Sequence, residues 1–228
     1  MKRKKIVLAY SGGLDTSVCV KWLSEEKGYD VLCFSADVGQ GVNAPLLKKR
    51  AKGSGAKKIV IQDLRREFLR DFIFPTLKAG AVYESHYFLA TALSRPLIAK
   101  ALVGVARREK APAIAHGSTG KGNDQVRFEV SVAALAPDLE IIAPLREWNL
   151  TSREAEIAYA RRKKIPLEFG KKSIYSVDQN LWGRSIEAGP LRIPGLHRRK
   201  RSILRQRTRG GLPVAQRPLT FSFGKGFR

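Results

Sequence analysis

Short runs rich in β-forming residues alternate with longer amphipathic stretches from residue 5 to about residue 165. This alternation is typical of strands joined by helices, and it predicts an α/β fold in which helices flank a parallel five-stranded sheet. The expected strands are Lys5–Ala9, Val31–Ser35, Lys58–Ile61, Pro112–His116 and Glu140–Ala143. The expected helices are Leu14–Glu26, Arg65–Leu77, Tyr87–Arg107, Asp124–Leu135 and Ser152–Lys164, the last of them opened by a capping box of Thr151 and Glu154.

Composition narrows the class of protein further. The chain has 228 residues, 43% of them apolar, which is enough for one ordinary core and a smaller attachment. Its two cysteines, Cys19 and Cys33, cannot form a disulfide framework, and both are expected to be small core residues. No uncharged apolar stretch approaches the length of about 18 residues that a membrane helix needs. We therefore expect a cytoplasmic protein with no membrane partner.

The formal net charge of +23 is unevenly distributed. Residues 192–228 hold 11 of the 43 Lys and Arg residues and none of the 20 acidic residues. The segment has few apolar residues, so we expect a basic tail that is disordered when alone and that binds nucleic acid only non-specifically.

The motif that carries chemistry follows the first expected strand. Ser11-Gly12-Gly13-Leu14-Asp15-Thr16-Ser17 leads at once into a helix, so glycine backbone, hydroxyl groups and the positive end of a helix dipole meet at one point. The spacing differs from the Walker loop and from the dinucleotide glycine motif. It matches Ser-Gly-Gly-x-Asp-Ser/Thr, the pyrophosphate loop of enzymes that cleave ATP between its α and β phosphates.

A second constellation follows the fourth expected strand. Gly117, Gly120 and Gly122 form a loop at a strand's carboxyl end, where open α/β sheets bind their ligands. Asn123, Asp124 and Arg127 open the next helix, and together an amide, a carboxylate and a guanidinium can hold both charged ends of an amino acid. The alternative is a simple helix cap at Asn123 and a surface ion pair between Asp124 and Arg127.

Four blocks of sequence carry a resemblance to one family. They are residues 9–17 with 37–41, residues 116–129, residues 143–148 and residues 175–185, and in this order they closely resemble argininosuccinate synthase over about residues 3 to 191. The resemblance implies an adenine nucleotide alpha hydrolase-like, pyrophosphate-loop domain at residues 1–169. It also implies that residues 170–191 start an incomplete second, synthetase domain, which the tail of residues 192–228 then follows.

The family is a carbon–nitrogen ligase of arginine biosynthesis and the urea cycle. It condenses citrulline with aspartate to give argininosuccinate while ATP, with Mg²⁺, becomes AMP and pyrophosphate, and the full-length family is expected to form a homotetramer. No protein residue is expected to ligate the metal directly.

The resemblance also implies roles for individual residues. ATP would be bound by Ala9, Tyr10, Ser11, Gly12, Gly13, Leu14, Asp15, Thr16, Ser17, Ala36 and Gly117. The substrates would be bound by Tyr87, Thr119, Asn123, Asp124, Arg127, Ser176 and Ser185. Those expected to act in catalysis are Ser11, Asp15 and Asp124.

The sequence departs from the family pattern at two places. Ala92 stands where the family has a serine expected to touch citrulline. From residue 192 the chain reads Arg-Ile-Pro-Gly in place of Glu-Asp-Pro-Trp, which one base of frameshift explains because GAG-GAT-CCC-TGG becomes AGG-ATC-CCT-GGN. We therefore expect a truncated and impaired enzyme. The alternatives are an RNA-modifying pyrophosphate-loop ATPase and a non-enzymatic basic binding module.

Overall fold

The structure, a computed structural model, describes residues 3–85, 87–120, 122–150, 152–166 and 176–187. Its elements in chain order are β1 (Lys5–Ala9), α1 (Leu14–Glu25), β2 (Asp30–Asp37), α2 (Ala44–Gly53), β3 (Lys58–Asp63), α3 (Arg65–Glu67), a π-helical segment (Phe68–Ile73), α4 (Phe74–Lys78), α5 (Ala90–Glu109), β4 (Ala113–Ala115), α6 (Asp124–Leu135), β5 (Glu140–Ile142), α7 (Pro144–Glu147), α8 (Arg153–Arg162), β6 (Ser176–Gln179) and β7 (Arg184–Glu187).

The first five strands form one parallel sheet in the order β3-β2-β1-β4-β5. In its centre, Ile6 of β1 is in register with Val31 of β2 on one side and with Ala113 of β4 on the other. The expected five-stranded α/β fold is therefore confirmed. The chain first adds strands on one side of β1 and then on the other, so the strand order reverses between β1 and β4.

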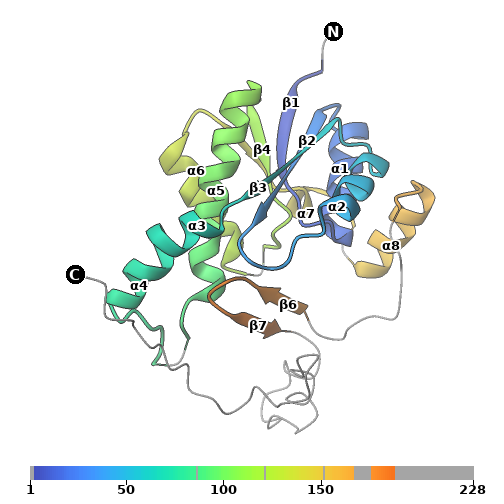
Figure 1. Ribbon diagram of the computed structural model, residues 1–228. Coiled ribbons are helices and arrows are strands. Elements are labelled where there is room, and N and C mark those ends of the chain that lie inside the picture. Colours follow the sequence, from blue (N-terminus) through green and yellow to red (C-terminus); the bar gives the residue numbers. More distant parts are fainter. Residues whose placement is uncertain (1–2, 86, 121, 151, 167–175, 188–228) are drawn as a thin grey trace, which may run out of the picture. The chain divides into compact units, whose positions relative to one another are not determined.

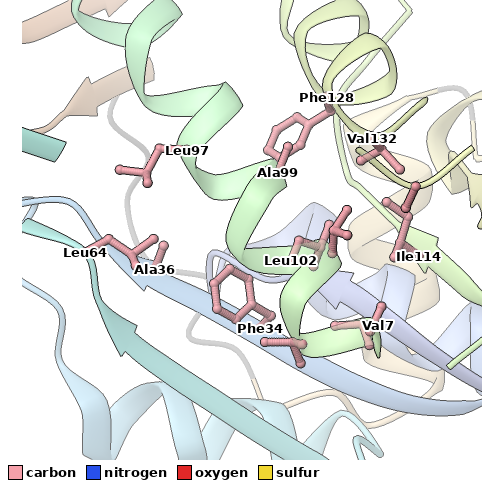
Figure 2. Close-up of a cluster of buried hydrophobic side chains, with 14 of the residues drawn as sticks. Val7, Phe34, Ala36, Leu64, Leu97, Ala99, Leu102, Ile114, Phe128 and Val132 are labelled. Atoms are coloured by element: carbon pink, nitrogen blue, oxygen red, sulfur yellow. The ribbon is translucent and has the colours of Figure 1, made fainter. Parts of the chain in front are cut away.

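Helices cover both faces of this sheet, and each face has its own core (Figure 1). Val7, Phe34 and Ile114 face α5 and α6, where Leu102 and Phe128 pack against them (Figure 2). The neighbouring residues on the same strands point the other way, because side chains alternate along a strand. Those buried on the second face are Ile6, Leu8, Val31, Cys33 and Ala115, which share a core with Cys19 of α1 and Ala160 of α8. Both cysteines are free and fully buried, as expected.

Two expected helices differ from the sequence prediction. The helix expected from Tyr87 begins only at Ala90, because Leu89 adopts a left-handed conformation with φ of 60° and interrupts the helical path. The stretch expected as one helix from Arg65 to Leu77 contains the π-helical segment, where Phe74 N–H donates to the Leu69 carbonyl, five residues back. Proline at position 75 has no N–H, so the regular ladder cannot run unbroken through this point.

The sequence prediction missed two helices, α2 and the short α7, and misassigned one cap. Residues 44–53 form α2, whose first turn is capped by Asn43, with Leu46 N–H donating to Asn43 Oδ1 at 3.0 Å. At the start of α8 the cap is Ser152, whose Oγ accepts from Ala155 N–H at 3.1 Å, so the expected box based on Thr151 is wrong. Thr151 itself lies outside the described residues.

The chain divides into two compact units, of which the first consists of Met1–Lys172 and Val177–Ser185. Within this unit, the turn after β6 reaches back to earlier elements: Asn180 Nδ2 donates to the Ala90 carbonyl at 2.8 Å, and Leu181 N–H donates to the Val38 carbonyl at 2.9 Å. Strands β6 and β7 pair with each other, and the sequence analysis predicted neither of them. The basic tail at 192–228 lies outside the described residues, and the domain boundaries at 169 and 191 stay predictions.

No helix in the described residues is long and apolar enough to cross a membrane.

Candidate nucleotide and substrate site

The carboxyl ends of three adjacent strands bring the predicted nucleotide residues to one edge of the sheet. Ala9 ends β1, Ala36 lies near the end of β2, and Gly117 follows β4 by two residues. The strand order reverses between β1 and β4, and ligands of open α/β sheets bind at such a reversal. A Cβ placed on Gly117 would lie 2.9 Å from Cγ2 of Thr16, so the two loops are already in close contact.

The loop after β1 presents backbone donors at the start of α1. Gly12 has φ of +78°, a conformation that favours glycine. Gly13 occupies the N-cap position of α1, and no side chain of the described residues caps the helix there. The first N–H groups of α1 are therefore available to an anion, and the helix dipole adds positive potential there. This geometry is suited to a phosphate group.

Hydroxyl groups line the same loop and bind one another. Ser11 Oγ lies 3.1 Å from Thr16 Oγ1, and Ser17 Oγ lies 3.0 Å from the hydroxyl of Tyr10. Tyr10 and Ser17 are buried, whereas Ser11 is exposed. Ser11 and Thr16 are thus placed to exchange their mutual contact for a ligand oxygen, while the buried Tyr10–Ser17 pair supports the loop from beneath.

A cation that the sequence prediction missed lies behind the loop. Arg50 of α2 donates from Nη1 to the Gly12 carbonyl at 3.1 Å. The prediction missed Arg50 because it missed the helix that carries it. The contact orients the carbonyl of Gly12 toward the guanidinium and adds positive charge near the loop.

The end of β2 is fixed by its own turn. Gln40 Nε2 donates to the Ala36 carbonyl at 2.6 Å, and Val38 N–H donates to Gln40 Oε1 at 2.8 Å. Ala36 is buried. These two hydrogen bonds therefore fix the backbone around Ala36 without the help of a bound nucleotide.

His116, at the end of β4, is buried and held in one tautomer. Ser118 N–H donates to Nδ1 at 3.3 Å, so Nδ1 is the acceptor and Nε2 carries the hydrogen toward Glu129 Oε1 at 3.2 Å. The ring also stacks on Phe128, with centroids 5.6 Å apart. Burial lowers the pKa of His116, although the Glu129 contact works in the opposite direction. His116 is thus a buried histidine whose two ring nitrogens both have partners within the protein.

The predicted substrate residues of α6 are brought together as their spacing indicated. Arg127 donates from Nη1 to Asp124 Oδ1 at 2.7 Å, and both side chains are partly exposed. Asn123 occupies the N-cap position, but in the described region its side chain makes no capping bond. Asn123 and Thr119 are exposed, so their polar groups are open to a ligand.

Arg95 of α5 joins this group, and the sequence prediction missed its role. Its Nε donates to Asp124 Oδ2 at 2.9 Å, and its Nη2 donates to Asp178 of β6. Only 18% of the Arg95 side chain is exposed. A guanidinium between two carboxylates on different elements fixes all three groups. The one signal in the sequence was that Arg95 is the single charged residue among the first ten residues of α5.

The remaining predicted substrate residues lie around the start of α5. Ser185 Oγ lies 3.2 Å from Thr91 Oγ1, next to the departure from the family pattern at Ala92. Tyr87 is half-buried and forms two backbone bonds with Tyr83, at 2.8 and 2.9 Å. The side chain of Ser176 lies outside the described residues.

The sequence prediction also missed Glu156, whose carboxylate lies beside the phosphate loop. Glu156 of α8 faces Asp15 of α1, and a hydrogen bond can form between the two side chains when one of them carries a proton. Burial, the negative charge of Asp15 and this hydrogen bond raise the pKa of Glu156 to about 8, with Arg153 acting in the opposite direction. Nothing in the spacing of the sequence signals this pair, because its members come from the first and last helices of the sheet domain.

The described residues contain no group of three or more His, Cys, Asp or Glu side chains that could hold a metal ion.

Comparisons with known proteins agree with this geometry. The family described as "Arginosuccinate synthase N-terminal HUP domain" matches residues 5–166. The chain is 59% identical over 191 residues to a protein named argininosuccinate synthase from Pelotomaculum thermopropionicum, which covers 84% of this chain and 48% of the relative. A protein of the same name from Dictyoglomus thermophilum is 57% identical over 194 residues, which are 85% of this chain and 49% of that relative. Another from Desulforamulus reducens is 58% identical over 190 residues, which are 83% of this chain and 47% of that relative.

The chain thus spans about half the length of the curated relatives it matches. The matched residues 5–166 contain the five-stranded sheet, the phosphate loop and the loop after β4. Sequence and architecture lead to one assignment: the chain belongs to the argininosuccinate synthase family, and its sheet domain is that family's N-terminal HUP domain.

Proposed function

We propose that this chain binds ATP at the phosphate loop and holds citrulline and aspartate beside it, as the nucleotide-binding part of an argininosuccinate synthase. The observation that carries the proposal is the contact between the loop of residues 11–17 and Gly117 where the strand order reverses. The complete reaction is proposed for the chain together with the half of the relatives' length that it does not span. The proposed compartment is the cytoplasm, because the buried free thiols of Cys19 and Cys33 suit a reducing environment.

In the proposed reaction the ureido oxygen of citrulline attacks the α-phosphorus of ATP. An oxygen–phosphorus bond forms as the bond to pyrophosphate breaks, which leaves a citrulline–AMP intermediate. The amine of aspartate then attacks the ureido carbon, AMP departs with the original ureido oxygen, and the amine loses a proton. No protein side chain forms a covalent bond in this sequence, so most of the rate comes from positioning.

The phosphate loop stabilises the charge that develops on the departing pyrophosphate. The free N–H groups at the start of α1 and the hydroxyls of Ser11 and Thr16 donate to phosphate oxygens. Mg²⁺ bound with the nucleotide supplies further charge neutralisation when present. Asp15 lies in the first turn of α1, and its carboxylate is proposed to orient the loop.

The group around α6 holds the amino-acid substrates. Asp124 attracts the ammonium group of aspartate, and Asn123 and Thr119 donate to its carboxylates. Arg127 donates to the carboxylate of citrulline, while Tyr87 and the hydroxyl of Ser185 contact the same substrate. Ser176 is proposed to contribute there too. Thr91 places its hydroxyl beside Ser185, whereas Ala92 has no hydroxyl to contribute there.

Isotope transfer tests the proposed chemistry. The reaction predicts that ¹⁸O in the ureido group of citrulline appears in AMP, when the chain is assayed with a protein supplying the second half of a relative. Label in pyrophosphate or none in AMP would contradict the order of bond making. Calorimetric titration of the chain alone with ATP and Mg²⁺ tests the binding step, and a lack of saturation would contradict the site.

No observation on the described residues favours an RNA-modifying enzyme or a basic binding module over this proposal. The homotetramer remains a prediction from the family resemblance.

A further inference from the structure

Two carboxylates from different helices meet beside the phosphate loop. Asp15 lies in the first turn of α1, and Glu156 lies in the first turn of α8. Lys163, at the end of α8, donates a hydrogen bond to Glu25 of α1 at 2.5 Å. Ala160 of α8 is fully buried in the core that the two helices share. The pair is therefore held in place by packing that does not involve either carboxylate.

The environment of Glu156 does not suit a free charge. Its Oε2 is buried, and no hydrogen-bond donor of the described residues reaches it. A buried carboxylate without a donor is costly when ionised. Facing it is another carboxylate, Asp15, and two carboxylates hydrogen-bond to each other only when one of them carries a proton.

We propose that Glu156 is a positioning residue that keeps a proton and donates it to Asp15, so that the loop meets the polyphosphate of ATP with one carboxylate charge instead of two. The inference rests on the proposed binding of ATP at this loop. The shared proton fixes the orientation of Asp15 and removes a negative charge that would repel the phosphates.

Charged and titratable groups from several elements surround the pair. Cys19 of α1 faces both carboxylates, and burial raises its pKa well above the usual range. Burial also raises the pKa of Tyr10 beneath the loop. Arg153 on α8 and Arg50 on α2 contribute guanidinium groups. Lys21 and Glu25 bind each other at 3.1 Å farther along α1.

His116 is the remaining titratable group near the loop. It lies just before Gly117, and because burial lowers its pKa it is already neutral at pH 7. Glu156, with its pKa raised to about 8, is therefore the group that changes charge between pH 7 and pH 9.5.

The sign of the effect follows from the charges. As pH rises through the pKa of Glu156, the proton leaves and a second negative charge appears beside the bound phosphates. The affinity for ATP then falls. We expect the dissociation constant for ATP with Mg²⁺ to rise about tenfold from pH 7 to pH 9.5, the size expected for one added charge at short range.

The decisive variant is Glu156→Gln, since glutamine has the shape of the protonated acid and donates a hydrogen bond at every pH. Its dissociation constant should change less than about twofold over the same range. Glu154→Gln is the matched control, because it removes the same charge from an exposed position in the same turn of α8. This control should follow the unmodified protein.

Each outcome has one meaning. A flat pH profile for the unmodified protein, or the same slope in Glu156→Gln and the unmodified protein, overturns the inference but leaves ATP binding intact. No binding of ATP at pH 7 by the unmodified protein contradicts the proposed function itself.

A second measurement needs no variant to fold. The infrared spectrum of the unmodified protein should contain a protonated-carboxyl band at pH 7 that disappears by pH 10. Its absence at pH 7 would overturn the shared proton.

Discussion

Arg95 donates to Asp124 Oδ2 at 2.9 Å and so links the N-terminal part of α5 to the start of α6. The same guanidinium also donates to Asp178, which makes it the common partner of two carboxylates. These three side chains are partly shielded from water. Removing one member of such an ion pair leaves the other charge without its partner, which destabilises the folded protein.

Replacement of Arg95 by glutamine should therefore destabilise the protein. We expect the free energy of unfolding to fall by about 2 kcal/mol, because two half-buried carboxylates lose their shared donor. Urea denaturation measures the change. The matched control is Arg107→Gln, since Arg107 lies on the same helix and pairs with Asp138, but on an exposed surface where the effect should be small. Equal losses in the two variants would contradict the special role of Arg95.

Gly12→Ala should abolish ATP binding. The residue has φ of +78°, and an added Cβ would lie 2.3 Å from Cδ2 of Leu47, so either the Leu47 side chain or the loop must shift. The matched control is Gly28→Ala, with φ of +71° and no atom within 4 Å of the added carbon. Both variants should lose about 1 kcal/mol of stability from the left-handed backbone. Only the first should lose nucleotide affinity in calorimetry, and retained affinity there would remove the loop from the proposed site.

Asn180→Asp should weaken the contact between the turn after β6 and the start of α5. The buried amide donates to the Ala90 carbonyl at 2.8 Å, and an aspartate of the same shape has no hydrogen to donate. We expect a loss of about 2 kcal/mol in the free energy of unfolding.

Asn43→Asp is the control for this substitution. At the start of α2 the Asn43 side chain only accepts a hydrogen bond, so aspartate caps equally well. Thermal unfolding of the two variants should differ clearly, and similar melting temperatures would argue against the Asn180 contact.

The pH dependence of stability should include a contribution from His116. Burial lowers its pKa in the folded protein below the unfolded value, so the folded state binds fewer protons. Its contribution is fully present above the unfolded pKa, near 6.5, and is lost as pH falls through the range between the two values. Between pH 7 and pH 5, stability should therefore fall less steeply in His116→Gln than in the unmodified protein. Parallel slopes in chemical denaturation would contradict this.

The basic tail should bind nucleic acid without sequence preference. Residues 192–228 carry 11 positive side chains and no acids, so binding would come from counterion release. We expect binding of a duplex oligonucleotide to weaken steeply between 50 mM and 200 mM salt, a range in which such complexes lose several orders of magnitude. Deletion of the tail should abolish it, and salt-insensitive binding would favour a folded nucleic-acid site.

The sheet and the phosphate loop were predictable because their signals are local. The alternation of strand and helix patterns, and the glycine pair between them, lie within short windows of sequence. The pairing of Asp124 with Arg127 was predictable for the same reason, because three residues span about one helical turn. The helix at residues 44–53 was not predicted, since its sequence is short, basic and only weakly apolar.

The rest of the site depends on contacts between distant parts of the chain. Glu156 meets Asp15 only because α8 packs on α1, and Arg95 meets Asp178 only because β6 folds back on α5. The left-handed conformation of Leu89 similarly has no signal in its own residue type, because leucine rarely adopts it. Tertiary packing decides these features, and a reading of local patterns cannot supply it.

The return of the turn after β6 to the start of α5 has a consequence for synthesis on the ribosome. All five strands of the main sheet have been made once Ile142 is added, so the sheet can begin to assemble early. The carbonyls of Val38 and Ala90, however, receive their partners from Leu181 and Asn180. During translation the edge proposed to hold the substrates therefore stays unfinished while the rest of the domain condenses, and a pause before residue 185 emerges would leave that edge exposed to chaperones.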